Sequence, residues 1–162
     1  MSPYSVAARS AADVSAAVKF AGKHNVRLVV KNTGHDFAGR SLAPHSLQIE
    51  TRRMRDLEFT KDFVAAGGEE GVGPAVTVGA GVQLVDLYSF CHERNVTVVG
   101  GFSSTVGVAG GYIQGGGHSI LSPWKGLASD NVLQYTVVTA DVSPSPSVPP
   151  SPLFSTIHLS VR

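Results

Sequence analysis

Two glycine-containing loops carry the residue types that could bind a ligand or do chemistry. The first reads KNTGHD over residues 31–36 and follows a short apolar stretch. Its His35 offers a neutral imidazole nitrogen, which is a nucleophile, and the neighbouring Asp36 could orient the ring or raise its basicity. A loop histidine more often only hydrogen-bonds its own turn, so this loop indicates a site without defining it.

The second loop runs from Gly100 to Gly117 and reads GGFSSTVGVAGGYIQGGG. It holds eight of the chain's 18 glycines, where an even spread over 162 residues would place two. Glycine lets backbone N–H groups turn outward and approach a ligand closely. With hydroxyls at 103–105 and no carboxylate, the loop suits an anion such as a pyrophosphate. A flexible linker is disfavoured, because apolar residues that pack occur between 106 and 113.

Two glycine patterns fail the tests for common nucleotide motifs. Residues 79–81 (GAG) begin like the G-x-G-x-x-G fingerprint, but Leu84 stands at the third glycine position. No carboxylate follows about 20 residues further on. Residues 107–111 (GVAGG) also lack the spacing, and no glycine precedes Lys-Ser or Lys-Thr as in a P-loop. We therefore interpret 79–81 as a tight turn between a strand and a helix.

Helices and strands alternate along the chain and place both loops after extended segments. Ser10 is a plausible N-cap, and apolar residues at helical spacing follow it. The predicted helices cover 11–24 and 82–94, and the predicted strands or extended segments cover 26–31, 47–50, 75–79, 96–99 and 132–139. Residues 54–59 are predicted to form a turn that leads into another extended segment. This order argues for an α/β or α+β domain, in which ligands bind at loops that leave strand ends.

Composition limits the possible classes of protein. With 43% apolar and 15% charged residues, the chain is long enough for one domain with a core. A net charge of +1 without a basic cluster gives no sign of nucleic-acid binding. The single Cys91 excludes an intrachain disulfide, no metal-ligand spacing is present, and no apolar run could span a membrane. Residues 1–10 show no secretory signal, which leaves the compartment open.

The C-terminal segment differs from the rest in composition. Residues 142–162 read VSPSPSVPPSPLFSTIHLSVR, with five of the nine prolines in the first eleven positions. Proline removes a backbone donor and cannot continue a helix. We therefore expect 142–162 to be a disordered Pro/Ser-rich tail.

Residues 31–41 (KNTGHDFAGRS) and 100–141 resemble the two flavin-binding segments of the vanillyl-alcohol oxidase, or p-cresol methylhydroxylase (PCMH), type of FAD-binding domain. They are most similar to berberine-bridge-enzyme-like FAD-linked oxidoreductases. The intervening elements fall in family order, so the resemblance covers residues 4–141. It implies an α+β, two-subdomain PCMH-type FAD-binding fold, incomplete at its C-terminal side.

The resemblance also implies roles for individual residues. His35 matches the histidine that in many members bonds covalently to the 8α-methyl carbon of the flavin. Ser103 stands where doubly attached members carry cysteine, so at most one link is expected. The residues implied to bind FAD are Asn32, Thr33, Gly34, His35, Asp36, Ser104, Thr105, Gly107, Gly110, Gly111, Gly115, Gly116, Gly117, Asn131 and Val132, the last two near the adenine end. No catalytic residue and no metal ligand is assigned.

The resemblance implies that a complete member oxidises a small molecule, such as an alcohol, a sugar or an alkaloid-like compound, and passes electrons to O₂. A histidyl link favours oxidase chemistry by raising the flavin's potential. Such members continue after the position of Asp141 with a long substrate domain, and here the proline-rich segment takes its place. Three interpretations stay open: the FAD-binding portion of such an oxidoreductase, a truncated non-catalytic remnant that binds FAD weakly or not at all, and a phosphate-binding module for another nucleotide.

Overall fold

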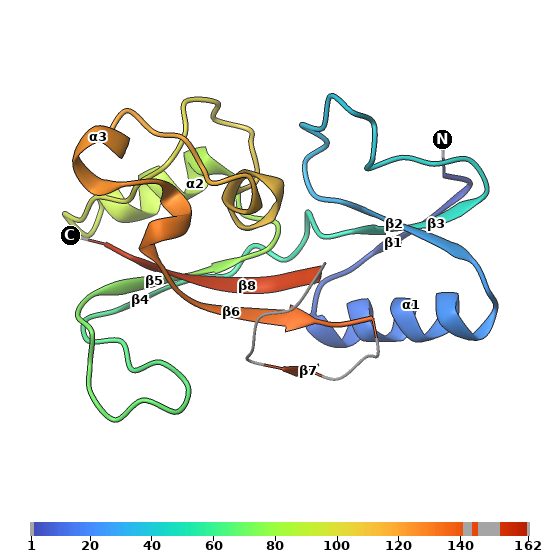
Figure 1. Cartoon of the computed structure of the whole chain (residues 1–162), viewed down its shortest axis with the longest axis horizontal. Helices are drawn as coiled ribbons and strands as arrows, with labels where there is room; N and C mark the ends of the chain where they lie inside the picture. Colours follow the sequence, from blue (N-terminus) through green and yellow to red (C-terminus); the bar gives the residue numbers. More distant parts are fainter. Residues whose placement is uncertain (1, 141–143, 146–152, 162) are drawn as a thin grey trace.

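The chain folds into two lobes that lie side by side, each built on its own sheet (Figure 1). The structure is a computed structural model and describes residues 2–140, 144–145 and 153–161. Strands and helices are both present, and each lobe combines a sheet with at least one helix. The α+β class with two subdomains, predicted from the sequence, is confirmed.

The first lobe is a parallel three-stranded sheet packed against one helix. Its strands are β1 (Tyr4–Ala7), β2 (Arg27–Lys31) and β3 (Ser46–Glu50), in the order β1-β3-β2. Helix α1 (Ala11–Lys23) lies along this sheet in Figure 1 and buries one apolar stripe, made of Val14, Ala17, Val18 and Ala21. The Ser10 hydroxyl accepts a hydrogen bond from the Asp13 N–H at 3.2 Å, as expected of an N-cap.

The second lobe is an antiparallel five-stranded sheet with helices on one face. The strands are β4 (Leu57–Thr60), β5 (Ala75–Gly79), β6 (Val132–Val138), β7 (Pro144–Ser145) and β8 (Leu153–Ser160), in the order β4-β5-β8-β6-β7. The helices are α2 (Leu84–His92), the helical turns η1 (Val108–Tyr112) and η2 (Ala128–Asn131), and the short α3 (Ser122–Lys125). Figure 1 shows them gathered above the sheet. Residues 96–99, predicted as extended, form no strand, although Val98 and Val99 are buried.

Strand β8 overturns one expectation from the sequence. The prediction of a disordered segment over 142–162 is wrong for residues 153–160. These residues form a strand that pairs with β5 on one side and β6 on the other. Ile157, Leu159 and Val161 alternate toward the core and are at most 1% exposed. This period-two pattern specifies a buried strand, and the prolines that precede it do not interrupt it. Residues 142–143, 146–152 and 162 lie outside the described residues.

The core of the second lobe fixes the shape of the second glycine loop. Leu84, Leu87 and Cys91 of α2 pack with β5, β8 and the loop residues Val108 and Ile113. Burial raises the pKa of the Cys91 thiol to about 11, which keeps it protonated and inert near neutral pH. A second buried cluster contains Met54, Ala80 and Val138 together with side chains of the first lobe, so the two lobes share packing. No helix in the described part of the chain is long and apolar enough to cross a membrane.

Candidate functional site

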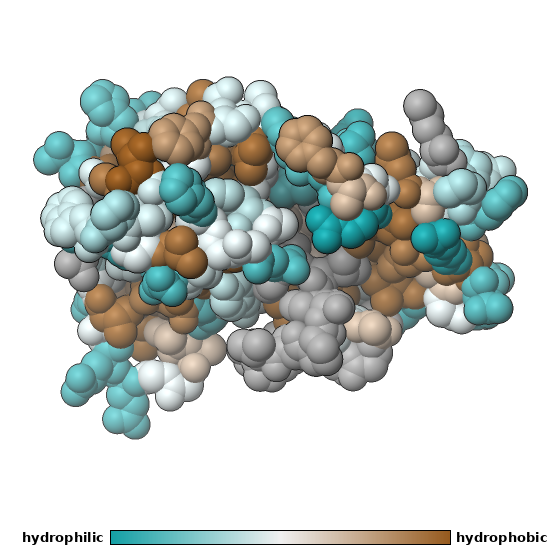
Figure 2. Space-filling view, turned by 45° about the horizontal axis from the view of Figure 1, so that its top comes forward, coloured by the Kyte–Doolittle hydropathy of each residue, from teal (hydrophilic) through white to brown (hydrophobic). Residues whose placement is uncertain are grey.

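A cavity of about 530 Å³ lies where the two glycine loops meet. Its lining comes from both lobes: Val30, Asn32, Thr33, Gly34, His35, Asp36, Arg40, Ser41 and Thr51 from the first, and Ala80, Val106, Gly107, Ala109, Gly110, Gly111, Tyr112, Gln114 and Gly115 from the second. In Figure 2 the surface is hollowed between the lobes, and hydrophilic side chains border the hollow. The two loops that the sequence singled out are therefore opposite walls of one cavity.

Asn32, the first residue after β2, connects the two walls. Its Nδ2 donates to the Ala80 carbonyl at 2.6 Å, while its Oδ1 is buried without a hydrogen-bond partner among the described residues. A Cβ at Gly107 would collide with the Asn32 amide, so glycine is needed where the walls approach. A buried acceptor without a partner is costly, and a ligand donor in the cavity would satisfy it.

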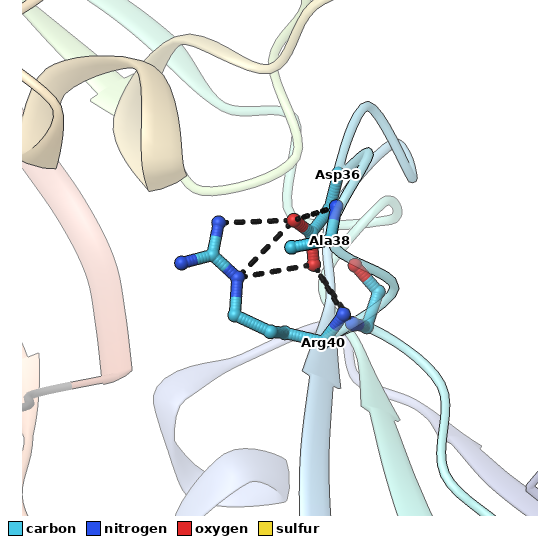
Figure 3. A network of polar contacts seen from close by, with 4 residues as sticks. Asp36, Ala38 and Arg40 are labelled. Carbon is cyan, nitrogen blue, oxygen red and sulfur yellow. Dashed lines mark hydrogen bonds and ion pairs between the residues drawn. The ribbon is translucent and has the colours of Figure 1, made fainter.

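The Asp36 carboxylate stabilises the conformation of the first loop. Its carboxylate accepts hydrogen bonds from the backbone N–H groups of Ala38, Arg40 and Ser41 at 3.3, 2.5 and 3.1 Å. It also accepts from Nη2 of Arg40 at 2.9 Å and from its Nε at 3.2 Å (Figure 3). The hydrogen bond from the Arg40 side chain lowers the pKa of Asp36 below its ordinary value, and the same bond raises the pKa of Arg40.

His35 reaches across to the second wall. Its Nε2 lies 2.8 Å from the Thr105 hydroxyl oxygen, which joins residues 70 positions apart. The sequence suggested that Asp36 orients this ring, but the Asp36 carboxylate is occupied by Arg40 and by the loop's own N–H groups. In the structure it is Thr105 that holds the imidazole.

The second wall is built into the core of its lobe. The start of α2 holds the first part of this wall, since the N–H groups of Leu84 and Val85 donate to the carbonyls of Val106 and Ser104 at 3.0 Å each. Turn η1 then buries Val108 and Ala109. Burial raises the pKa of Tyr112 to about 12, so this lining phenol is neutral, and it donates to the His118 carbonyl at 2.9 Å.

The structure brings most of the residues implied by the resemblance to the cavity. Nine of them line it: Asn32, Thr33, Gly34, His35, Asp36, Gly107, Gly110, Gly111 and Gly115. Thr105 adjoins it through the contact with His35.

Five implied residues are not among the lining residues: Ser104, Gly116, Gly117, Asn131 and Val132. The carbonyls of Gly116 and Gly117 accept from Ser129 and Ala128, and Nδ2 of Asn131 donates to the carbonyls at 125 and 127. Val132 pairs with Leu159 in the sheet. Each of the five therefore makes contacts within the second lobe in this structure.

Sequence reasoning missed several lining residues because their place depends on the tertiary structure. Thr51 follows β3 and Ala80 lies in the turn that was interpreted as structural. Arg40 and Ser41 belong to the first loop, but no glycine or histidine pattern marks them. The spacing of Arg40 four residues after Asp36 was the one local signal of an ion pair. The described residues contain no group of three or more His, Cys, Asp or Glu side chains that could hold a metal ion.

Comparison with known proteins identifies the domain. The sequence profile of a family described as "FAD binding domain" matches residues 3–142. The chain belongs to the FAD-binding domain family. Its curated relatives include an "Uncharacterized FAD-linked oxidoreductase" of Arthroderma benhamiae, which is 57% identical over 139 residues, 85% of this chain and 24% of the relative. This chain thus spans about a quarter of that relative's length.

Solved structures share the fold of this FAD-binding domain. The VAO-type flavoprotein MtVAO615 of Myceliophthora thermophila C1 superposes with a TM-score of 0.88 at 38% identity, over 97% of this chain and 31% of that protein. A BBE-like protein of Physcomitrella patens superposes with a TM-score of 0.81 at 23% identity, over 97% of this chain and 36% of that protein. The resemblance to the vanillyl-alcohol oxidase type is therefore confirmed.

The residues of the cavity fit FAD, the cofactor of this family. The lining is mostly uncharged, with glycines and hydroxyls on both walls, which suits a dinucleotide. The unpartnered Asn32 Oδ1 offers an acceptor for a ligand hydroxyl or N–H group. Val30, Ala80, Val106 and Ala109 add apolar surface that a ring system could cover.

Proposed function

We propose that this chain forms the flavin-holding part of an FAD-linked oxidoreductase that oxidises a small molecule, such as an alcohol, a sugar or an alkaloid-like compound, and passes the electrons to O₂. The observation that carries the proposal is the shared cavity, closed by two glycine-containing walls that the His35–Thr105 contact joins. When bound, FAD supplies two-electron oxidation chemistry that side chains lack. The name of the Arthroderma benhamiae relative supports the same reaction class.

We infer that the flavin is attached through His35. This residue is exposed at the cavity, and Thr105 holds its Nε2. Its Nδ1 has no protein partner among the described residues, so this nitrogen can face a ligand while the ring stays oriented. A C–N bond at Nδ1 would replace an N–H bond of the imidazole and a C–H bond of the flavin methyl group, and the two electrons and two protons released would reduce O₂ to hydrogen peroxide.

The other lining residues would bind and orient the cofactor. Asn32 presents its buried carbonyl oxygen to a donor on the cofactor, and the backbone around Gly107 and Gly110 allows close approach. The apolar residues Val30, Ala80 and Val106 exclude water from the part of the cavity that they line. None of these groups titrates near neutral pH, so they support binding and not proton transfer.

The test is a measurement of bound flavin on the purified chain. We expect a yellow protein whose flavin spectrum stays with the pellet after acid precipitation. In His35→Ala the flavin should be released into the acid supernatant. His92→Ala, which removes an exposed imidazole on α2, should behave like the parent chain.

Other outcomes would point to the other interpretations. Added FAD should raise the thermal midpoint of flavin-free protein, because a ligand that binds only the folded state stabilises it. A colourless protein whose midpoint does not respond to FAD would contradict the proposal and favour a non-binding remnant. An equal response to FAD and ADP would favour a general nucleotide module.

A further inference from the structure

We propose that Arg40 binds the diphosphate of the dinucleotide, through the nitrogen of its guanidinium group that Asp36 leaves free. This inference rests on the proposed function, since it takes FAD as the occupant of the cavity. It gives a role to a residue that neither the glycine pattern nor the histidine indicated.

The charge balance of the cavity calls for a cation. A dinucleotide brings two negative charges with its diphosphate. Among the described residues that line the cavity, Arg40 carries the one permanent positive charge and Asp36 the one carboxylate. No other lining residue that the structure describes is a lysine, an arginine or a carboxylate. An anion in this cavity therefore has Arg40 as its counter-charge.

The backbone donors at the end of the first loop, residues 38–41, are already used. The N–H groups of Ala38, Arg40 and Ser41 donate to the Asp36 carboxylate, and the N–H of Gly39 donates to the Asp36 carbonyl at 3.0 Å. Four successive N–H groups could otherwise have formed a nest for a phosphate. Because an internal carboxylate fills that nest, a phosphate beside Arg40 meets the Arg40 side chain and not these four N–H groups.

Arg40 is held in a geometry that offers such a donor. Its Nε and Nη2 contact Asp36, and Figure 3 shows the remaining nitrogen, Nη1, turned away from the carboxylate. The side chain of Arg40 is 82% exposed, whereas that of Asp36 is 17% exposed. One edge of the guanidinium is thus fixed and the other is accessible, which limits the entropy lost when a phosphate binds.

Neighbouring arginines are engaged elsewhere. Arg52 donates from Nη1 to the Gly81 carbonyl at 2.7 Å and from Nη2 to the Gln83 side chain at 2.6 Å. Arg55 pairs with Asp86 at 2.7 Å. Neither residue lines the cavity. Arg40 is therefore the arginine in position to meet a bound anion.

The experiment compares three ligands that share the flavin ring and differ in phosphate: riboflavin, FMN and FAD. All variants are made in the full chain on a His35→Ala background, so that the ligand exchanges freely, and binding is measured by quenching of flavin fluorescence. Arg40→Gln should weaken FAD binding about tenfold, as expected for loss of one charge-assisted hydrogen bond, and weaken FMN binding less. Riboflavin binding should stay unchanged. Arg40→Lys should retain part of the affinity, because it keeps the charge and loses the planar group.

Arg27→Gln is the matched control, since Arg27 is exposed at the opposite end of β2 from the loop. It should leave all three affinities unchanged. Equal FAD affinity in Arg40→Gln and its parent would overturn the role of Arg40 and leave the proposed function intact. Equal weakening of riboflavin and FAD would also overturn it, by showing a role in loop structure. If the parent binds none of the three ligands, the proposed function fails and this inference fails with it.

Discussion

The two walls of the cavity are built by different physical means. The first, residues 32–41, is a largely exposed loop held by polar contacts that converge on the Asp36 carboxylate. The second, residues 100–117, is held by packing, because Val108, Ala109 and Ile113 are buried in the core of the second lobe. The charged side chains and the histidine of the cavity lie on the first wall, and the second supplies shape. A site can thus place its adaptable chemistry on a loop while a rigid core fixes the opposing surface.

The largest expected effect comes from removing the packing behind the second wall. Ile113 is 2% exposed, and Ile113→Ala should destabilise the chain by about 2–5 kcal/mol because it leaves a cavity in the core. Ile120→Ala is the matched control, since Ile120 is 70% exposed. Denaturant unfolding measures both. Similar losses in the two variants would contradict a core that holds the second wall.

A smaller effect is expected where the walls touch. A Cβ in Gly107→Ala would collide with the Asn32 amide, which should cost about 1–3 kcal/mol and prevent tight FAD binding. Gly22→Ala on α1 also has no neighbouring atom within 4 Å of the new Cβ, lies outside the cavity lining, and should fold and bind FAD like the parent. Thermal unfolding and FAD titration of both variants give the comparison. If Gly107→Ala keeps parental affinity, the walls are less closely opposed than the structure indicates.

The smallest effect on stability is expected at the first wall. The pKa of Asp36 is lowered from 3.8, so its contribution is present above that pH and is lost as the pH falls through the folded-state value. Asp36→Asn should therefore lower the thermal midpoint slightly at pH 7, and the difference from the parent should vanish in acid. The chosen measurement is the thermal midpoint of both proteins from pH 7 to pH 2. A difference that persists unchanged in acid would show that the carboxylate charge does not hold the loop.

Much of the fold could be predicted from local patterns. Ser10 followed by apolar residues at helical spacing predicted α1, and the β-branched run at 75–79 predicted β5 within its observed bounds. Strand β8 was missed because the prolines before it dominated the composition of 142–162. The alternation of Ile157, Leu159 and Val161 was visible in the sequence. That this segment pairs with β5 and β6 could be seen only in the structure.

The candidate site, like the fold, could be predicted only in part from the sequence. Glycine density and the KNTGHD loop predicted two binding segments, and the structure lines one cavity with both. The partner of His35 could not be predicted, since Thr105 lies 70 residues away and Asp36 is adjacent. Nor could the sequence tell that Asn131 contacts the carbonyls at 125 and 127 and lies outside the cavity lining.

The sequence by itself determined the local conformations of this protein, because glycine content, capping residues and apolar periodicity act over a few residues. It therefore specified two glycine-containing turns and most of the helices and strands around them. Only the tertiary structure decided that Thr105 meets His35, that Asp36 turns to Arg40, and that β8 enters the middle of a sheet. Such contacts join distant residues, and they depend on strand register and on the packing of whole elements, which no local pattern records.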